Sequence, residues 1–493
     1  MKISIDKSSK VPVYLQIADQ IKAQIISGAL PRSSALPSER ALAQILDVHR
    51  NTVVKAYGEL KSDAWIESRQ GVGYLVASAS TEKEPVGESG EGVQMGRVNW
   101  VNEVADKYLD MEKTFDDLFQ RFTDESHFSL GSGVASREVY SSERVAHDIA
   151  GLLTGSGPSQ YFFSPYKGDR FLRQKLASFL GTKGVKASSG EIQILSETNQ
   201  ALDFIVTLLV KPGDSVVMEE PVHPDMYRVM ELAGARILTV PVDEDGMNCD
   251  VLESLLTQTR PRLIFVNSSF HDPTGCILSL ERRKKLVELS SRYRIPIVEE
   301  DAASELVYDG DKLPPIKAFD TTGNVIYIYS FSLTFIPGLS LAFVTGNRDF
   351  VRALSYLVSV RLMASDWMTQ KLLGMYLDDG SYYSSLATFR EIYGGNRDLV
   401  CQKLDALAHL GVRYERPRGG VYVWCRLPDG VDSKHFINRA YNMGVTLIPG
   451  HVFYPYKNGG RDYIRINYSY ESRERLACGM DVLHKALEEE LEE

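Results

Sequence analysis

The chain has 493 residues, more than a single hydrophobic core normally supports, which predicts two or three domains. Its apolar share of 44% and charged share of 24% fit a soluble globular protein and exclude a fibrous or wholly disordered chain. The formal net charge of −10 argues against nucleic acid bound along the whole length, but the first 76 residues carry about +3 and the remainder about −13.

Residues 1–76 have the pattern of a small helical head that ends in a hairpin. Residues 65–66 and 74–76 are expected to form two short strands around a glycine-containing turn. Helix, helix-turn-helix and hairpin in this order predict a winged helix-turn-helix. The apolar residues expected to face its core are Val13, Ile17, Ile21 and Ile25 in residues 12–27, Leu42, Ile45 and Leu46 in a short helix opened by Pro37 and Ser38, and Val53, Val54, Tyr57 and Leu60 in residues 49–64.

Basic and polar residues lie where such a head would meet DNA. Side chains at the N-terminal end of a recognition helix reach base edges, and an arginine fork reads guanine bidentately. Helix N-termini suit phosphates, and a glycine-tipped hairpin lets the backbone approach the minor groove. The residues expected to contact DNA are Ser38, Arg40, Arg50, Asn51, Thr52, Lys55, Arg69 and Gly71.

Three ordered motifs in the head favour DNA binding over a merely solvated charged face. They are LPSERALAQ (36–44), VHRNTVVKAYGEL (48–60) and SRQGVGYLV (68–76). Together they resemble the GntR family of bacterial transcription factors over residues 11–76, and the resemblance implies a double-stranded DNA operator as partner. One departure is His49, which stands where many members have a serine.

The rest of the chain predicts a linker and an α/β body. Residues 77–96 are rich in Ser, Gly and Glu, which predicts a flexible linker. Largely continuous apolar runs then alternate with amphipathic segments, which predicts a mostly parallel sheet covered on both faces in residues 97–370 and a smaller α+β lobe in residues 371–493. The expected strands are 192–195, 215–218, 236–240, 263–266, 295–298, 325–329, 341–344, 421–423 and 463–467.

Several stretches of the body resemble fold-type I aminotransferases, and head and body together resemble the MocR-type regulators of the GntR family. The stretches include SSGEIQILSETNQALDFI (188–205), FVNSSFHDPTGCILS (265–279), IVEEDAASELVYDG (297–310), SFSLTFIPGLSLAFV (330–344) and YIRINYSY (463–470). The resemblance implies the fold-type I architecture, a homodimer, and pyridoxal phosphate as the family's cofactor. That cofactor needs a lysine for its Schiff base, an acid for its ring nitrogen and donors for its phosphate.

On these motifs, the sequence departs from the family at most of the cofactor positions. Leu333 stands at the Schiff-base lysine and Ser340 at the phosphate-binding arginine, within residues 321–347, which contain no charged residue. The other predicted members of this degenerate cofactor site are Glu197 and Thr198 at the phosphate turn, Glu300 at the ring-nitrogen aspartate, Ala302 at a tyrosine, His223 at the ring-stacking aromatic, Asp272 at the NPTG asparagine, and Asn199 and Ser330, which remain polar.

These departures all weaken the binding of the same cofactor. A charge-assisted hydrogen bond contributes roughly 1.5–3 kcal/mol, so three or four losses lower the cofactor affinity by several orders of magnitude. Leu333 removes the covalent anchor as well. We therefore predict no covalent pyridoxal phosphate, no catalytic residue and a pseudoenzyme body. The alternative is an active pyridoxal-phosphate aminotransferase with a vestigial head.

Arg465 is the one charged family position that remains, and it matches the arginine that grips the substrate carboxylate. A buried arginine needs a partner. Two uses stay open: an internal ion pair with an acid such as Asp272 or Glu197, or a small carboxylate or amino-acid effector. A third alternative makes the body a protein-interaction platform that takes no small ligand.

Cysteine usage and hydropathy bear on the compartment. The five cysteines are widely spaced and form no CxxC pair, which suits a reducing compartment and offers no zinc site. The N-terminus lacks the apolar segment of a signal peptide, and no run of about eighteen apolar residues occurs. The sequence therefore predicts a cytoplasmic protein with no membrane partner.

Overall fold

A computed structural model describes residues 3, 5, 12–26, 29–31, 34–46, 48–62, 65–69, 73–76, 121, 126–136, 138–155, 165–336, 338–362 and 366–492. The chain divides into two compact units, Met1–Val98 and Asn99–Glu493. The predicted linker, residues 77–96, and the predicted wing residue Gly71 lie outside the described residues.

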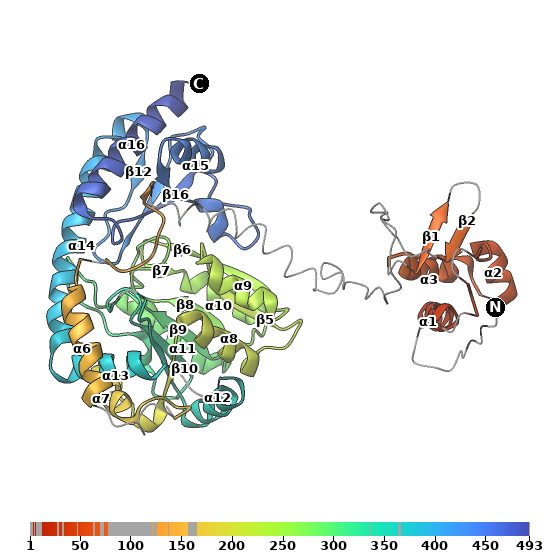
Figure 1. The fold of residues 1–493 in the computed structure, drawn as a ribbon, viewed down its shortest axis with the longest axis horizontal. Helices are drawn as coiled ribbons and strands as arrows, with labels where there is room; N and C mark the ends of the chain where they lie inside the picture. Colours follow the sequence, from red (N-terminus) through yellow and green to blue (C-terminus); the bar gives the residue numbers. More distant parts are fainter. Residues whose placement is uncertain are drawn as a thin grey trace, which may run out of the picture. The chain divides into compact units, whose positions relative to one another are not determined.

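The described residues of the first unit form three helices and a two-stranded sheet in the predicted order (Figure 1). Strands β1 and β2 pair antiparallel, with Ile66 opposite Val76. An isolated bridge between Ala35 and Leu75 joins this hairpin to the segment just before α2. The hairpin and the start of α2 are therefore held together. The elements are α1 (Val13–Ile26), α2 (Glu39–Leu46), α3 (Arg50–Ser62), β1 (Ile66–Arg69) and β2 (Gly73–Val76).

The core of the head lies between its helices, and two residues predicted to face it do not. Ile45 is 69% exposed and Val54 is 38% exposed. On α2 the buried face runs through Leu42 and Ala43, and at roughly 100° per residue Ile45 lies well to one side of it. Val54 is likewise one position beyond the buried Val53. Both predictions were wrong because a face was assigned too broadly on a short helix.

The second unit is built on an eight-stranded sheet with the order β4-β11-β10-β9-β8-β5-β6-β7. Strands β10, β9, β8, β5 and β6 pair in parallel, whereas β11 is antiparallel to both its neighbours and β7 is antiparallel to β6. The predicted mostly parallel sheet is confirmed. The strands are β4 (Ile192–Leu195), β5 (Ser215–Glu220), β6 (Arg236–Asp243), β7 (Gly246–Met247), β8 (Ile264–Asn267), β9 (Ile297–Asp301), β10 (Val325–Ser330) and β11 (Ala342–Thr345).

Helices cover both faces of this sheet. Helices α8, α9 and α12 pack on one face, and α7, α10, α11 and α13 pack on the other. Strand β10 shows why the apolar runs are continuous: Ile326 and Ile328 enter the first core, whereas Tyr327 and Tyr329 enter the second. The helices are α6 (Ser142–Gly155), α7 (Arg170–Thr182), α8 (Thr198–Leu209), α9 (Pro224–Leu232), α10 (Cys249–Gln258), α11 (Leu280–Tyr293), α12 (Arg348–Arg361) and α13 (Trp367–Asp378).

A smaller lobe follows, with an antiparallel sheet of order β12-β13-β16-β15. Helix α14 packs on both α13 and α16 and so joins the large and small parts of the body (Figure 1). The early strand β3 pairs with β14 of this lobe, and the predicted boundary at residue 371 falls inside α13. The elements are β3 (Phe128–Ser129), α14 (Ser381–Asp405), β12 (Arg413–Tyr414), β13 (Tyr422–Arg426), α15 (Ser433–Asn442), β14 (Val445–Thr446), β15 (Ile448–Pro449), β16 (Tyr463–Asn467) and α16 (Arg473–Glu492).

Candidate DNA-binding surface and body site

The predicted DNA-contacting residues of the head gather at the N-terminal ends of α2 and α3. Arg40 is the second residue of α2 and is exposed, and Arg50 and Asn51 are the exposed first two residues of α3. Thr52 is half-buried and Lys55 is exposed on the next turn of α3. Helix N-termini carry partial positive charge and unpaired N–H groups, so this end of each helix suits phosphate oxygens.

Two side chains near these helix starts cap the helices. The Ser38 hydroxyl accepts a hydrogen bond from the Ala41 amide at 3.3 Å. His49 Nδ1 accepts one from the Asn51 amide at 3.2 Å, so the histidine at this position caps α3. Arg69 ends β1, directly opposite Gly73 in the hairpin. The sequence marked His49 only as a departure from the family serine and did not reveal this capping role.

The body site lies at the carboxyl ends of the parallel strands. Asn267 ends β8 and links two carboxyl groups. Its backbone N–H donates to Glu219 Oε2 at 2.6 Å, and its side-chain amide donates to Glu300. Burial raises the pKa of Glu219 and the pKa of Glu300 to about 8 each. Burial also lowers the pKa of the nearby His271 to about 4. Burial therefore favours the uncharged form of all three groups.

Arg465, on β16 of the small lobe, has an acid partner within the protein. Its Nη1 donates to both carboxylate oxygens of Asp272 at 2.7 Å, and its Nη2 donates to the Gly131 carbonyl at 2.9 Å. The guanidinium lies 4.2 Å from the centre of the Tyr422 ring and is almost completely buried. Burial acts to raise the pKa of Asp272, but the charge of Arg465 outweighs it and lowers that pKa. Of the two acid partners proposed from the sequence, the structure pairs Arg465 with Asp272.

Of the residues predicted at the phosphate and ring positions of the cofactor, some lie near this ion pair and others lie at the start of α8. His223 caps α9 and places its Nε2 3.8 Å from Asp272. Glu197 immediately precedes α8, whose first two residues are Thr198 and Asn199. The side-chain amide of Asn199 donates to Asp225 at 3.2 Å. Partial burial raises the pKa of Glu197, and the neighbouring Ser340 hydroxyl acts against that rise. The helix end that would suit a phosphate thus carries a carboxyl group.

The remaining predicted positions serve packing and the turn. Leu333 is 6% exposed and belongs to the apolar core that includes the small lobe, with Ala302 packed against the same core. Ser330 Oγ donates to Ser332 Oγ at 3.1 Å and accepts from the Ser332 amide, so it stabilises its own loop. Leu333 has no nitrogen that could form a Schiff base. On the correspondence predicted from the motifs, the residues present do not fit a covalently held pyridoxal phosphate.

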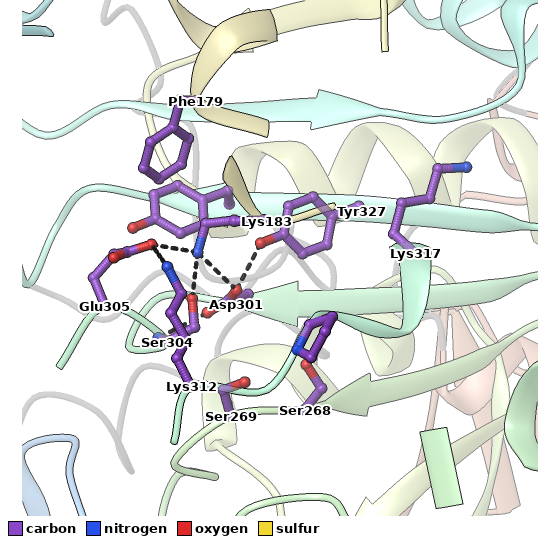
Figure 2. Close-up of polar contacts among 12 residues, drawn as sticks. Phe179, Lys183, Ser268, Ser269, Asp301, Ser304, Glu305, Lys312, Lys317 and Tyr327 are labelled. Carbon is purple, nitrogen blue, oxygen red and sulfur yellow. Dashed lines mark hydrogen bonds and ion pairs between the residues drawn. The ribbon is translucent and has the colours of Figure 1, made fainter. Parts of the chain in front are cut away.

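A buried ion cluster, which no sequence motif indicated, lies on the opposite side of β9 from Glu300. Figure 2 shows the Lys183 ammonium between Ser304 at 2.6 Å, Glu305 at 2.7 Å and Asp301 at 3.8 Å. The Tyr327 hydroxyl donates to Asp301 at 2.6 Å. Burial acts to raise the pKa of Glu305, but Lys183 and a second lysine outweigh it and lower the pKa to about 2. These contacts fix the end of the strand that carries Glu300.

The described part of the chain offers neither a metal site nor a membrane span. No group of three or more His, Cys, Asp or Glu residues in it is placed to hold a metal ion. No helix in the same residues is long and apolar enough to cross a membrane.

The fold and the two sites define a DNA-binding head joined to an aminotransferase-like body, and comparison with known proteins agrees. Residues 13–76 match the family described as bacterial regulatory proteins, gntR family, and residues 125–481 match aminotransferase class I and II. The chain belongs to the aminotransferase class I and II family. With its head, it is a GntR-type DNA-binding regulator fused to an aminotransferase-like domain.

Its relatives include regulators and enzymes. The HTH-type transcriptional regulator YisV of Bacillus subtilis is 27% identical over 477 residues, which cover 96% of each chain. The probable rhizopine catabolism regulatory protein MocR of Rhizobium meliloti is 28% identical over 458 residues, 90% of this chain and 88% of its own. The multiple substrate aminotransferase of Thermococcus profundus matches in structure with a TM-score of 0.75 at 27% identity, covering 80% of this chain and all of that one. Proteins of this fold family normally bind pyridoxal phosphate.

Proposed function

We propose that the protein is a cytoplasmic transcriptional regulator that binds a DNA operator as a homodimer and whose body works without covalent pyridoxal phosphate. The observation that carries the proposal is Leu333, an apolar side chain packed into the body core. The motifs of the sequence assign this position to the cofactor lysine of the family. Without that lysine the body has no anchor for the aldehyde and no base for transamination. Its remaining roles are dimerisation and the sensing of a small effector.

The Arg465–Asp272 pair supports one class of effector over another. A plain carboxylate that took Arg465 would leave Asp272 buried without its counter-charge, and breaking such a buried pair costs about 3–5 kcal/mol. An amino acid brings both groups, because its carboxylate can pair with Arg465 while its ammonium pairs with Asp272. We therefore propose an amino acid, rather than a keto acid, as the effector.

The absence of a covalent cofactor is tested by mixing the purified protein with pyridoxal phosphate and reducing with borohydride. We expect no aldimine absorbance band and no stoichiometric phosphopyridoxyl adduct on any single lysine in peptide mass spectra. A stoichiometric adduct on one lysine would overturn this part of the proposal. The multiple substrate aminotransferase of Thermococcus profundus, assayed in parallel, is the positive control for the reduction.

The effector is tested by calorimetric titration of the full-length protein with pools of amino acids and of keto acids. Heat from an amino-acid pool that is absent from the keto-acid pool supports the proposal. Heat from the keto-acid pool alone overturns the proposal of an amino-acid effector. Heat from neither pool also overturns it, and favours a body that serves protein interactions and takes no small ligand. The double variant Arg465→Leu with Asp272→Leu should abolish the heat while retaining the fold, because it removes both buried charges together.

A second candidate function, an active aminotransferase, is favoured by the likeness to the Thermococcus profundus enzyme over the whole body. It requires turnover of an amino group between an amino acid and a keto acid in the presence of pyridoxal phosphate. A coupled transaminase assay on the wild-type protein decides between the two, since we expect no turnover above that of a boiled sample.

A further inference from the structure

A carboxylate that no DNA-contact prediction includes lies between the recognition helix and the wing of the head. Glu39, the first residue of α2, accepts hydrogen bonds on Oε2 from Arg50 Nη2 at 2.8 Å and from Arg50 Nε at 3.3 Å. Its other oxygen, Oε1, accepts a hydrogen bond from the Tyr74 hydroxyl at 3.0 Å. One side chain therefore joins the starts of α2 and α3 to the second strand of the hairpin.

Tyr74 is itself held firmly in the head. Its ring packs edge-on against Tyr57 of α3, with ring centres 4.8 Å apart, and the Tyr57 hydroxyl donates to the Pro37 carbonyl at 2.8 Å. The Leu36 amide donates to the Tyr74 carbonyl at 2.8 Å, which ties the wing strand to the segment before α2. Glu39 thus has a fixed partner on its core side and an exposed partner, Arg50, on its outer side.

The geometry of the ion pair leaves the DNA-facing edge of the guanidinium available. The Glu39 carboxylate binds the Nε and Nη2 edge of Arg50, and among the described residues of the head no other side chain bonds to that guanidinium. The remaining Nη1 and Nη2 edge can donate two parallel hydrogen bonds to O6 and N7 of guanine. The Arg50 side chain is 53% exposed and the Glu39 side chain only 18% exposed. The carboxylate therefore lies beneath the guanidinium that it holds.

We propose that Glu39 is a positioning residue for base recognition: it holds the Arg50 fork in the orientation that reads a guanine and couples that orientation to the wing through Tyr74. A free arginine loses side-chain entropy when it meets a base edge, and a fork that is already held loses less. The carboxylate also repels DNA phosphates, so its presence raises discrimination between sequences while it lowers affinity for DNA in general.

The proposal rests on the operator binding proposed above, and the experiment separates the two. Full-length wild-type protein is used to select duplexes from a randomised DNA library, and affinities are then measured for the selected duplex and for a shuffled duplex of the same composition. If no sequence is enriched, operator binding itself fails. If one is enriched, the ratio of the two affinities tests the role of Glu39.

We expect Glu39→Gln to lower this affinity ratio by about fivefold, the factor that corresponds to an exposed ion pair, while the affinity for the shuffled duplex rises. Tyr74→Phe should lower the ratio by a smaller factor, about twofold, since it removes only the hydrogen bond to Oε1. Asp19→Asn, which removes an exposed acid on α1, is the matched control and should leave the ratio unchanged.

The decisive measurement places Glu39→Gln in an Arg50→Ala background. A residue that acts through Arg50 has no further effect on the affinity ratio once Arg50 is gone. The proposal is overturned if Glu39→Gln leaves the ratio unchanged in the wild-type background, or if it lowers the ratio equally in the Arg50→Ala background. In the latter case Glu39 contributes only to the structure of the head.

Discussion

The arginine at a family motif position in the head, Arg50, and the one in the body, Arg465, differ in their exposure and in their partners. In the head, Arg50 is 53% exposed and pairs with an acid along one edge only. In the body, Arg465 is 2% exposed and is already paired with Asp272, a largely buried acid of the same protein. The family position in the head is thus available to an outside partner, whereas the one in the body is already satisfied. An arginine that matches a motif is informative about function only when its exposure and partner are known.

The largest effect should come from removing the exposed arginines of the head. Arg40→Ala with Arg50→Ala should delete two predicted DNA contacts of about 1–3 kcal/mol each, so affinity for the selected operator should fall by about 30-fold to 10⁴-fold. The salt dependence of the remaining binding should also flatten, because fewer counterions are released. Fluorescence anisotropy at several salt concentrations measures both. Unchanged operator affinity would mean that another surface reads the DNA.

The same truncation in the body should act on stability. Arg465→Ala leaves Asp272 buried without a counter-charge, and the free energy of unfolding of the body should fall by about 3–5 kcal/mol. Replacing both residues by leucine should cost far less, since no uncompensated charge remains. Urea unfolding followed by circular dichroism compares the two variants. Equal losses in both would show that the ion pair is not what stabilises this region.

The pH dependence of body stability should separate the two sides of β9. The folded pKa of Glu300 is raised from 4.5 to about 8, so the stability linked to its proton is present below pH 4.5 and is lost as the pH rises through 8. The folded pKa of Glu305 is lowered from 4.5 to about 2, so its stability is present above pH 4.5 and is lost as the pH falls through 2. Each slope is at most about 1.4 kcal/mol per pH unit.

Two single variants check these slopes in urea unfolding series from pH 3 to 9. Glu300→Gln should flatten the alkaline side and leave the acidic side intact. Glu305→Gln should weaken the acidic side, at a cost in stability at neutral pH because Lys183 loses its closest carboxylate. If Glu300→Gln left the alkaline slope as steep as in the wild type, Glu219 would be the group responsible, since burial raises its pKa to about 8 as well.

Local patterns predicted the elements, and long-range contacts set the sites. Strands β4 and β16 have the predicted bounds, because isoleucines at every second position mark them in the sequence. Strand β9 runs to Asp301, beyond its predicted end at residue 298, because its last residues are acids that a hydropathy pattern assigns to a loop. Those acids are tolerated inside the protein only through partners far along the chain, such as Lys183.

The same limit applies to the sites themselves. The motifs proposed the positions of the degenerate cofactor site, and Asp272 was one of two partners that the sequence suggested for Arg465. Its pairing depends on the small lobe meeting the end of β8, which no local signal encodes. Glu39 lies within the motif that predicted α2. Its hydrogen bonds with Arg50 and Tyr74 form only when the hairpin folds back on the starts of α2 and α3. Side chains that act through others are therefore the ones that sequence patterns miss.

The smallest expected effect tests how narrow the buried face of α2 is. Ile45→Ser should change the protection of α2 amides by less than about 0.5 kcal/mol, since a 69% exposed side chain buries little on folding. Leu42→Ala, on the buried face of the same helix, should cost about 2–5 kcal/mol. Hydrogen exchange of the full-length protein, read on peptides from α2, measures the two in one experiment. Equal losses would place Ile45 against a partner surface, and the exposed side of this short helix would then serve an interface.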